Sequence, residues 1–163
     1  MCDIIAYTDG GCRGNPGIGA WAYLLIHRPS ARALEQADGE RQTTNNRMEL
    51  TAVLKCLQAL TRPDTELEIR SDSKYTIDCC EKWLPGWKRN GWRRKGGPLK
   101  NVDLLQELDA LLARHRVRFR WVKGHAGEVG NEYVDGLLNR AMDQLGRGAP
   151  AAHHKRRHFQ LPT

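Results

Sequence analysis

Apolar and polar positions divide the chain into a strand-rich first part and a helix-rich remainder. Residues 3–8 form a short apolar run, residues 20–27 (AWAYLLIH) form a second, and residues 35–43 form a more polar third. Glycine, proline and serine separate the three runs, as they separate short strands. The pattern therefore predicts three consecutive strands joined by short connections in an antiparallel meander.

The period of the pattern changes to that of a helix after residue 45. Apolar residues recur at helical spacing from residue 46 to residue 60, and Glu49 falls on the apolar stripe one turn from the start. A glutamate on a buried face rarely lacks a partner. Glu49 is therefore expected either to form a salt bridge, for example with Arg47, or to bind a cation.

A fourth strand over residues 65–71 alternates polar and apolar residues and ends in Asp72 and Ser73. Both are favoured helix N-caps, and a helix is expected over residues 74–82. Asp72 has two interpretations. It is a helix cap, or it is a site residue at the carboxyl end of a strand, where α/β sheets place their chemistry.

The remaining pattern predicts a helix over residues 103–112, a strand over 117–122 and a last helix over 131–145 with Asp135 on its apolar stripe. The order of elements favours an α/β (α+β) fold, a five-stranded mixed sheet with helices on both faces. The glycines do not spell a nucleotide-binding loop. We expect residues 1–145 to form one domain and residues 146–163 to form a basic, disordered tail.

The composition narrows the class of partner. The chain has 163 residues and a formal net charge of +7, which favours anionic partners, nucleic acid first. No apolar run is long enough to cross a bilayer, and no leader pattern is visible at the N-terminus. The five cysteines show no metal-binding spacing. We therefore expect a cytoplasmic protein with reduced thiols and no membrane partner.

The excess positive charge is concentrated between residues 82 and 100. This stretch holds seven lysines and arginines, no acidic residue, and the tryptophans Trp83, Trp87 and Trp92. Cationic side chains neutralise phosphates, and indole rings stack on bases or sugars. The alternative is a solvated segment whose tryptophans dock it on the core. We expect at least one tryptophan to serve as an anchor and the charges to bind nucleic acid.

Four carboxylates occupy comparable places. Asp9 follows the first strand and precedes a glycine-rich stretch, Asp72 follows another strand, and Glu49 and Asp135 lie near the starts of buried helix faces. Alone, Asp9 could be a turn residue that hydrogen-bonds its own backbone. Four converging carboxylates require cations, and oxygen ligands favour Mg²⁺ or Mn²⁺. Together with the basic stretch, they indicate a nucleic-acid phosphodiesterase.

The motifs that carry these residues resemble those of bacterial type I ribonuclease H. They are Tyr-Thr-Asp-Gly at 7–10, Gly-Asn-Pro-Gly at 14–17, TTNNRMEL at 43–50, Ser-Asp-Ser at 71–73 and WVKGHAG at 121–127. Gly91-Trp92 and Asn131-Glu132 are also similar to that family. The resemblance runs from about residue 3 to residue 145, with the motifs in the family's order.

The resemblance implies a ribonuclease H-like fold and an endonuclease that hydrolyses the RNA strand of RNA–DNA hybrids. It implies a monomer that uses two Mg²⁺ ions, leaves 5′-phosphate and 3′-hydroxyl ends, and removes replication primers and R-loops. Carried over residue by residue, the metal-binding and catalytic carboxylates are Asp9, Glu49, Asp72 and Asp135. His125 corresponds to the family's mobile histidine, which assists proton transfer or product release.

The resemblance also implies the substrate contacts. Five positions match the lining of the hybrid's minor groove, where 2′-hydroxyls identify RNA: Cys12, Asn15, Asn45, Asn46 and Lys74. Thr44 and Arg47 match the grip on a phosphate of the DNA strand. The stretch from 82 to 100 matches the family's basic protrusion, with Trp83 facing the DNA strand. The remaining expected contacts are Lys88, Arg89, Trp92, Arg93, Arg94 and Asn131.

Two departures and two alternatives accompany this interpretation. Lys74 stands where the family usually has Gln, and residues 125–130 are richer in glycine and acid than is usual. The glycines after Asp9 are expected to leave room for the minor groove. The alternatives are another polynucleotidyl transferase of the same fold, such as an integrase or junction resolvase, and a non-catalytic hybrid-binding module.

Overall fold

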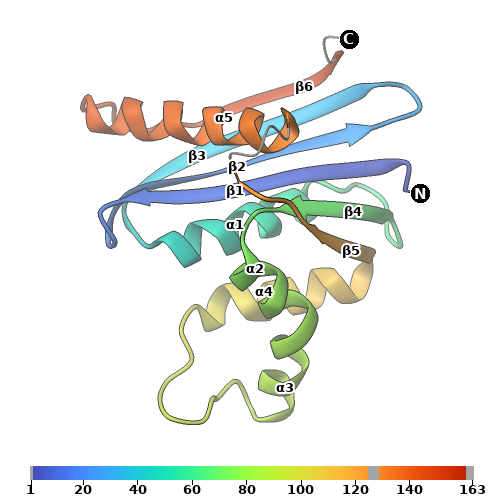
Figure 1. The fold of residues 1–163 in the computed structure, drawn as a ribbon, viewed down its shortest axis with the longest axis vertical. Helices are drawn as coiled ribbons and strands as arrows, with labels where there is room; N and C mark the ends of the chain where they lie inside the picture. The colour runs from blue at the N-terminus through green and yellow to red at the C-terminus, as the bar shows by residue number, and fades with distance from the viewer. Residues whose placement is uncertain (1, 125–128, 161–163) are drawn as a thin grey trace.

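The computed structural model describes residues 2–124 and 129–160. In these residues a six-stranded mixed sheet carries helices on both faces, with the strand order β5-β4-β1-β2-β3-β6 (Figure 1). The fold class expected from the sequence is confirmed, with one strand more than the five expected. The strands are β1 (Ile4–Arg13), β2 (Gly17–His27), β3 (Arg32–Thr43), β4 (Glu66–Ser71), β5 (Arg116–Trp121) and β6 (His154–Gln160).

The first three strands form the predicted antiparallel meander, and β4 and β5 run parallel to β1. β1 is longer than the pattern suggested. It continues through the first glycines to Arg13, with Gly10 paired to Trp21 and Cys12 paired to Gly19. Asp9 therefore lies within a strand, opposite Ala22, rather than after its end. The backbone ladder to β2 offsets the low strand propensity of the two glycines.

The sixth strand comes from the segment expected to be a disordered tail. β6 pairs antiparallel with β3, from His154 opposite Ala37 to Gln160 opposite Arg32. The expectation of disorder is thus incorrect for residues 154–160. The strand escapes pattern analysis because it carries five consecutive basic residues and no apolar alternation. Its side-chain contacts to the body of the protein are largely polar.

Two hydrophobic cores lie on opposite faces of the sheet. α1 (Asn45–Gln58) and α4 (Val102–Arg114) cover one face, and α5 (Val129–Gly146) covers the other (Figure 1). The periodicity of α1 predicted its buried face correctly, including Glu49, which is only 7% exposed. None of the helices in the described part of the chain is long and apolar enough to span a membrane.

The helix expected over residues 74–82 is divided. α2 (Lys74–Asp78) passes into a π-helical turn, η1 (Cys79–Trp83), and then into α3 (Leu84–Arg89). α3 and the loop after it extend away from the sheet (Figure 1). We call residues 82–100 the basic projection. Trp87 and Trp92 pack against the core formed by α1 and α4, so both serve as anchors.

Candidate active site

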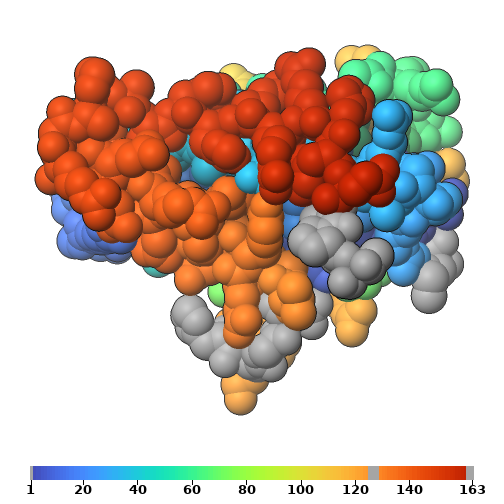
Figure 2. Space-filling view, turned by 90° about the horizontal axis from the view of Figure 1, so that it is seen from above, coloured from blue at the N-terminus to red at the C-terminus, as the bar shows by residue number. Residues whose placement is uncertain are grey.

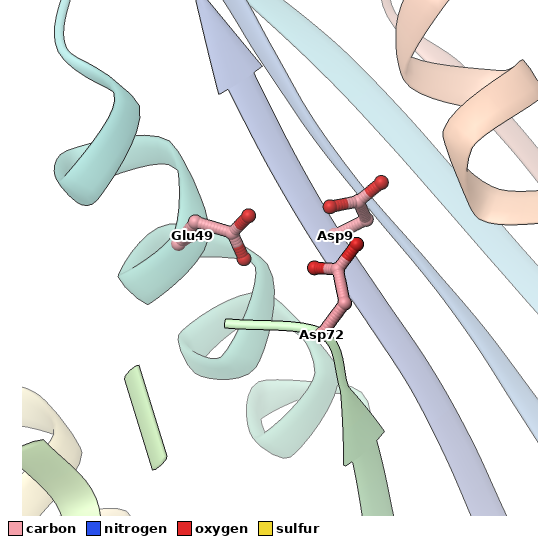
Figure 3. Close-up of side chains that lie close together, drawn as sticks. All are labelled: Asp9, Glu49 and Asp72. Carbon is pink, nitrogen blue, oxygen red and sulfur yellow. The ribbon is translucent and has the colours of Figure 1, made fainter. Parts of the chain in front are cut away.

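Three carboxylates from separate elements meet at one place. Asp9 projects from β1, Glu49 from the first turns of α1, and Asp72 from the residue directly after β4. One carboxylate oxygen from each lies within 4.8 Å of the others. Figure 3 shows the three side chains turned toward one another. We call these three residues the acidic cluster.

Close packing of α1 on β1 brings Glu49 to the cluster. A Cβ atom at Gly10 would lie 2.3 Å from the backbone carbonyl carbon of Met48, so only glycine permits this approach. β1 and β4 are parallel neighbours, which places Asp72 beside Asp9. The glycine at position 10 therefore admits α1. Gly10 and Gly11 also line the cavity described below, and the expectation that the glycines after Asp9 leave room for a minor groove stays a prediction.

The hydrogen bonds of the cluster decide between the alternatives left open for Glu49. The Oδ1 atom of Asp9 accepts a hydrogen bond from the Gly10 N–H at 3.0 Å. The Oε2 atom of Glu49 is buried and has no hydrogen-bond partner among the described residues. Arg47 does not compensate it, because its guanidinium pairs with Asp103 at 2.7 Å. Glu49 is left with an oxygen that suits a cation.

The cap interpretation of Asp72 is also settled. Ser73 caps α2 instead, and its Oγ accepts a hydrogen bond from the Thr76 N–H at 3.1 Å. The indole Nε1 of Trp121 donates to the backbone carbonyl oxygen of Asp72 at 3.1 Å. Sequence reasoning gave Trp121 no role. The signal was available, since Trp121 ends the strand that runs parallel to β4 and pairs with Ser71.

Electrostatics show what the cluster requires. Burial raises the pKa of the Asp9 carboxyl to about 8, and the negative charges of Asp72 and Asp135 act in the same direction. Burial and the neighbouring carboxylates likewise raise the pKa of Glu49 above its ordinary range. Carboxylates this close are stable only when bound protons or cations neutralise their charges. The all-oxygen donor set with one unpartnered oxygen fits a hard divalent cation.

Asp135 is half-buried and lines the same open cavity as the acidic cluster, a space of about 510 Å³. Its charge reaches Asp9, although it is not one of the three residues whose oxygens lie within 4.8 Å. The structure therefore brings the four predicted carboxylates to one cavity, three of them in close contact. His125 lies outside the described residues, and its role stays a prediction.

Several expected substrate contacts surround this cavity. Cys12, Asn45 and Asn46 line it. Asn15 lies next to them, and its Oδ1 accepts a hydrogen bond from the Asn45 N–H at 3.1 Å. Thr44 is the N-cap of α1 and accepts a hydrogen bond from the N–H of Arg47. Asn45 and Asn46 are both exposed at the cavity.

The remaining expected contacts differ in their surroundings. The ammonium group of Lys74 lies 4.5 Å from the centre of the Trp121 ring, and Asn131 is only 4% exposed. In the basic projection, Trp83 is 41% exposed, and Lys88 forms a salt bridge with Asp109 at 2.9 Å. The exposed cations there for which no ion pair is found within the described residues are Arg89, Arg93, Arg94, Lys95 and Lys100.

Comparison with known proteins agrees with this geometry. A family model described as RNase H matches residues 2–143. The chain belongs to the RNase H family. The RNase H of Acidithiobacillus ferrooxidans, named "Ribonuclease H", is 52% identical over 149 residues, which are 91% of this chain and 92% of that protein. The family assignment makes the chain an endoribonuclease, and its acidic cluster suits the metal dependence of RNase H enzymes.

Solved RNase H structures share the fold. LC9-RNase H1, described as a type 1 RNase H with the type 2 active-site motif, superposes with a TM-score of 0.78 at 32% identity. The match covers 86% of this chain and 72% of that chain. LC11-RNase H1, solved in complex with RNA/DNA hybrid, has a TM-score of 0.63 at 24% identity, covering 87% of this chain and 98% of that chain.

Proposed function

We propose that the protein hydrolyses the RNA strand of RNA–DNA hybrids at the acidic cluster, with Mg²⁺ as its cofactor and Mn²⁺ as a substitute. One observation carries the proposal. Three carboxylates from β1, α1 and the end of β4 lie within 4.8 Å, and a buried oxygen of Glu49 lacks a partner in the described chain. Such a set serves to hold divalent cations at a phosphodiester.

Asp9, Glu49, Asp72 and Asp135 would hold two ions. When bound, the ions activate the attacking water and stabilise the leaving 3′-oxygen. The oxygen of water would bond to phosphorus as the bond from phosphorus to the 3′-oxygen breaks. The water would lose a proton and the leaving 3′-oxygen would gain one, so the products carry a 5′-phosphate and a 3′-hydroxyl. The acidic cluster would fix where the scissile phosphate sits.

The cavity supports a choice of RNA over DNA. The amide side chains of Asn45 and Asn46 both donate and accept hydrogen bonds, as a 2′-hydroxyl does. Cys12 adjoins them, and its thiol donates to the carbonyl oxygen of Gly14 at 2.8 Å. LC11-RNase H1, which shares the fold, is itself described in complex with RNA/DNA hybrid. These groups would contact the wide minor groove of the hybrid.

The electrostatic surroundings agree with this substrate. The chain carries a net charge of +7, and the basic projection extends from the body beside α4 (Figure 1). A hybrid that lies across the cavity and the projection would place phosphates against exposed arginines. We propose that the enzyme acts as a cytoplasmic monomer on replication primers and R-loops.

The experiment is a cleavage assay on an end-labelled hybrid, with Mg²⁺ or with a chelator. We expect Mg²⁺-dependent shortening of the RNA strand, an intact DNA strand, and no cleavage of single-stranded RNA or duplex DNA. Cleavage of duplex DNA would favour another polynucleotidyl transferase. Tight hybrid binding without cleavage would favour a non-catalytic binding module. Either result contradicts the proposal.

A further inference from the structure

A buried carboxylate outside the acidic cluster lies on the opposite side of the sheet from helix α1. Glu35 lies near the start of β3, and its side chain is 3% exposed. A carboxylate in that position must be paired and hydrogen-bonded. Burial would raise the pKa of Glu35, but three hydrogen bonds outweigh burial and hold the pKa below its ordinary value. The group is therefore an ionised carboxylate.

The partners of Glu35 come from two elements that are distant in sequence. The Tyr133 hydroxyl of α5 donates to Oε1 of Glu35. From β6, Nε2 of His154 lies 2.7 Å from Oε2, and the Arg156 guanidinium donates to Oε1 at 3.1 Å. Arg156 also donates to the Tyr133 hydroxyl at 2.9 Å. We call Glu35, Tyr133, His154 and Arg156 the β6 clamp.

The register of β6 explains why these side chains reach the clamp. Arg156 is paired with Glu35 in the ladder, so both side chains stand on the face covered by α5. Its guanidinium also lies 3.7 Å from the centre of the Phe159 ring, which fixes its orientation. The next residue, Arg157, pairs with Leu34 and points to the other face. Figure 2 shows β6 and α5 side by side on one surface of the molecule.

The β6 clamp contacts α5 through Tyr133, close to Asp135. Tyr133 precedes Asp135 by two residues, so the two side chains leave the helix about 200° apart. A helix held through Tyr133 on one side cannot rotate freely to carry Asp135 away from the cavity on the other. On the same turn, Gly130 lies against the Tyr7 ring, where a Cβ would be 2.3 Å from ring carbons. Contacts at Tyr133 and at Gly130 therefore both hold the start of α5 in place.

We propose that the β6 clamp positions Asp135 at the acidic cluster, making Tyr133 and Arg156 positioning residues for metal binding. The inference rests on the proposed function in that Asp135 completes the metal site. β6, which carries His154 and Arg156, lies beyond residues 2–143, the part that the family model matches, whereas Glu35 and Tyr133 lie within it. Ligand-orienting contacts of this kind tune metal affinity.

The test is isothermal titration calorimetry with Mg²⁺ on the whole chain without nucleic acid. Tyr133→Phe removes only the hydroxyl, and Arg156→Gln weakens the grip of β6. We expect both variants to bind Mg²⁺ with affinity reduced by about 10-fold. Arg157→Gln is the matched control, because it removes the same charge from the same strand on the opposite face. Its Mg²⁺ affinity should equal that of the parent.

Circular dichroism would establish that each variant is folded before titration. Equal Mg²⁺ affinities for Tyr133→Phe, Arg156→Gln and Arg157→Gln would overturn the inference, as would a parent that binds no Mg²⁺. Because the titration contains no hybrid, its result is separate from the proposed reaction. A parent that binds Mg²⁺ through a clamped Asp135 but cleaves no hybrid would refute the reaction alone.

Discussion

The acidic cluster and the basic projection carry opposite charges in opposite environments. In the cluster, Asp9 and Glu49 are 6% and 7% exposed, and an oxygen of Glu49 lacks a partner among the described residues. In the projection, the cations are exposed, and the side chain of Lys88 is 60% exposed even though it pairs with Asp109. Burial strengthens electrostatic interactions and solvent screens them. Each carboxylate of the cluster should therefore be indispensable, whereas the projection should act as a sum of weak contributions.

The largest expected effect is the loss of one buried carboxylate. Glu49→Gln keeps the shape of the side chain and removes the charge that a cation needs. We expect kcat for Mg²⁺-dependent hybrid cleavage to fall about 1,000-fold, with hybrid binding retained. Glu107→Gln is the matched control, since Glu107 is exposed on α4. Its turnover should equal that of the parent. An equal loss in both variants would mean that the buried carboxylate is no more important than an exposed one.

The projection should respond to charge removal in proportion. We expect replacement of its four central cations by Gln to weaken hybrid binding by about 10-fold or more and to reduce the slope of log Kd against log salt. Fluorescence anisotropy between low and physiological salt measures both quantities. The four positions are Lys88, Arg89, Arg93 and Arg94.

A control for this experiment removes four exposed cations outside the projection. Its hybrid affinity and salt slope should change less than those of the projection variant, because these residues lie away from the cavity. A salt slope equal to the parent's after neutralising the projection would mean that the projection is only a solvated face. The control positions are Arg62, Arg114, Arg116 and Arg118.

The smallest expected effect concerns stability without metal. The pKa of Asp9 rises from an ordinary 3.8 to about 8 in the folded protein. The folded state thus holds this proton more tightly than the unfolded chain does. That contribution to stability is present at low pH and is lost as pH rises toward 8. Asp9→Asn should therefore stabilise the metal-free protein at pH 8 by about 2 kcal/mol.

Thermal unfolding in a chelator at pH 5 and pH 8 measures this difference. The parent should lose stability between the two pH values, and Asp9→Asn should lose less. Mg²⁺ should restore the stability of the parent at pH 8. If the stability of the parent and of the variant changes with pH in parallel, the pKa of Asp9 is not raised by burial and its neighbours.

The sequence predicted the site better than the surroundings of the site. Helical periodicity placed Glu49 on a buried face, because a 14-residue amphipathic helix leaves little freedom in orientation. Asp72 could not be assigned from local pattern, because Asp72 and Ser73 are both good caps. Only the observed bond from the Thr76 N–H to Ser73 decides between them.

Features that depend on contacts between distant segments were not predictable. The sequence pattern indicates a loop residue at Gly10. Glycine is required there because the backbone of Met48, on α1, lies too close for a Cβ atom. Arg47 reads as a phosphate contact or a partner of Glu49, and it pairs with Asp103, 56 residues away. β6 reads as a charged tail because the anionic group that holds it, Glu35, lies 121 residues before Arg156.

If the buried carboxylates make this chain a metal-dependent hybrid nuclease, the loss of one of them should abolish cleavage. The most direct measurement compares the parent with Asp9→Asn on an end-labelled hybrid in Mg²⁺, with hybrid affinity measured on the same preparations. We expect cleavage of the RNA strand to be abolished while hybrid affinity stays within a small factor of the parent's. Near-normal cleavage by Asp9→Asn would contradict that expectation.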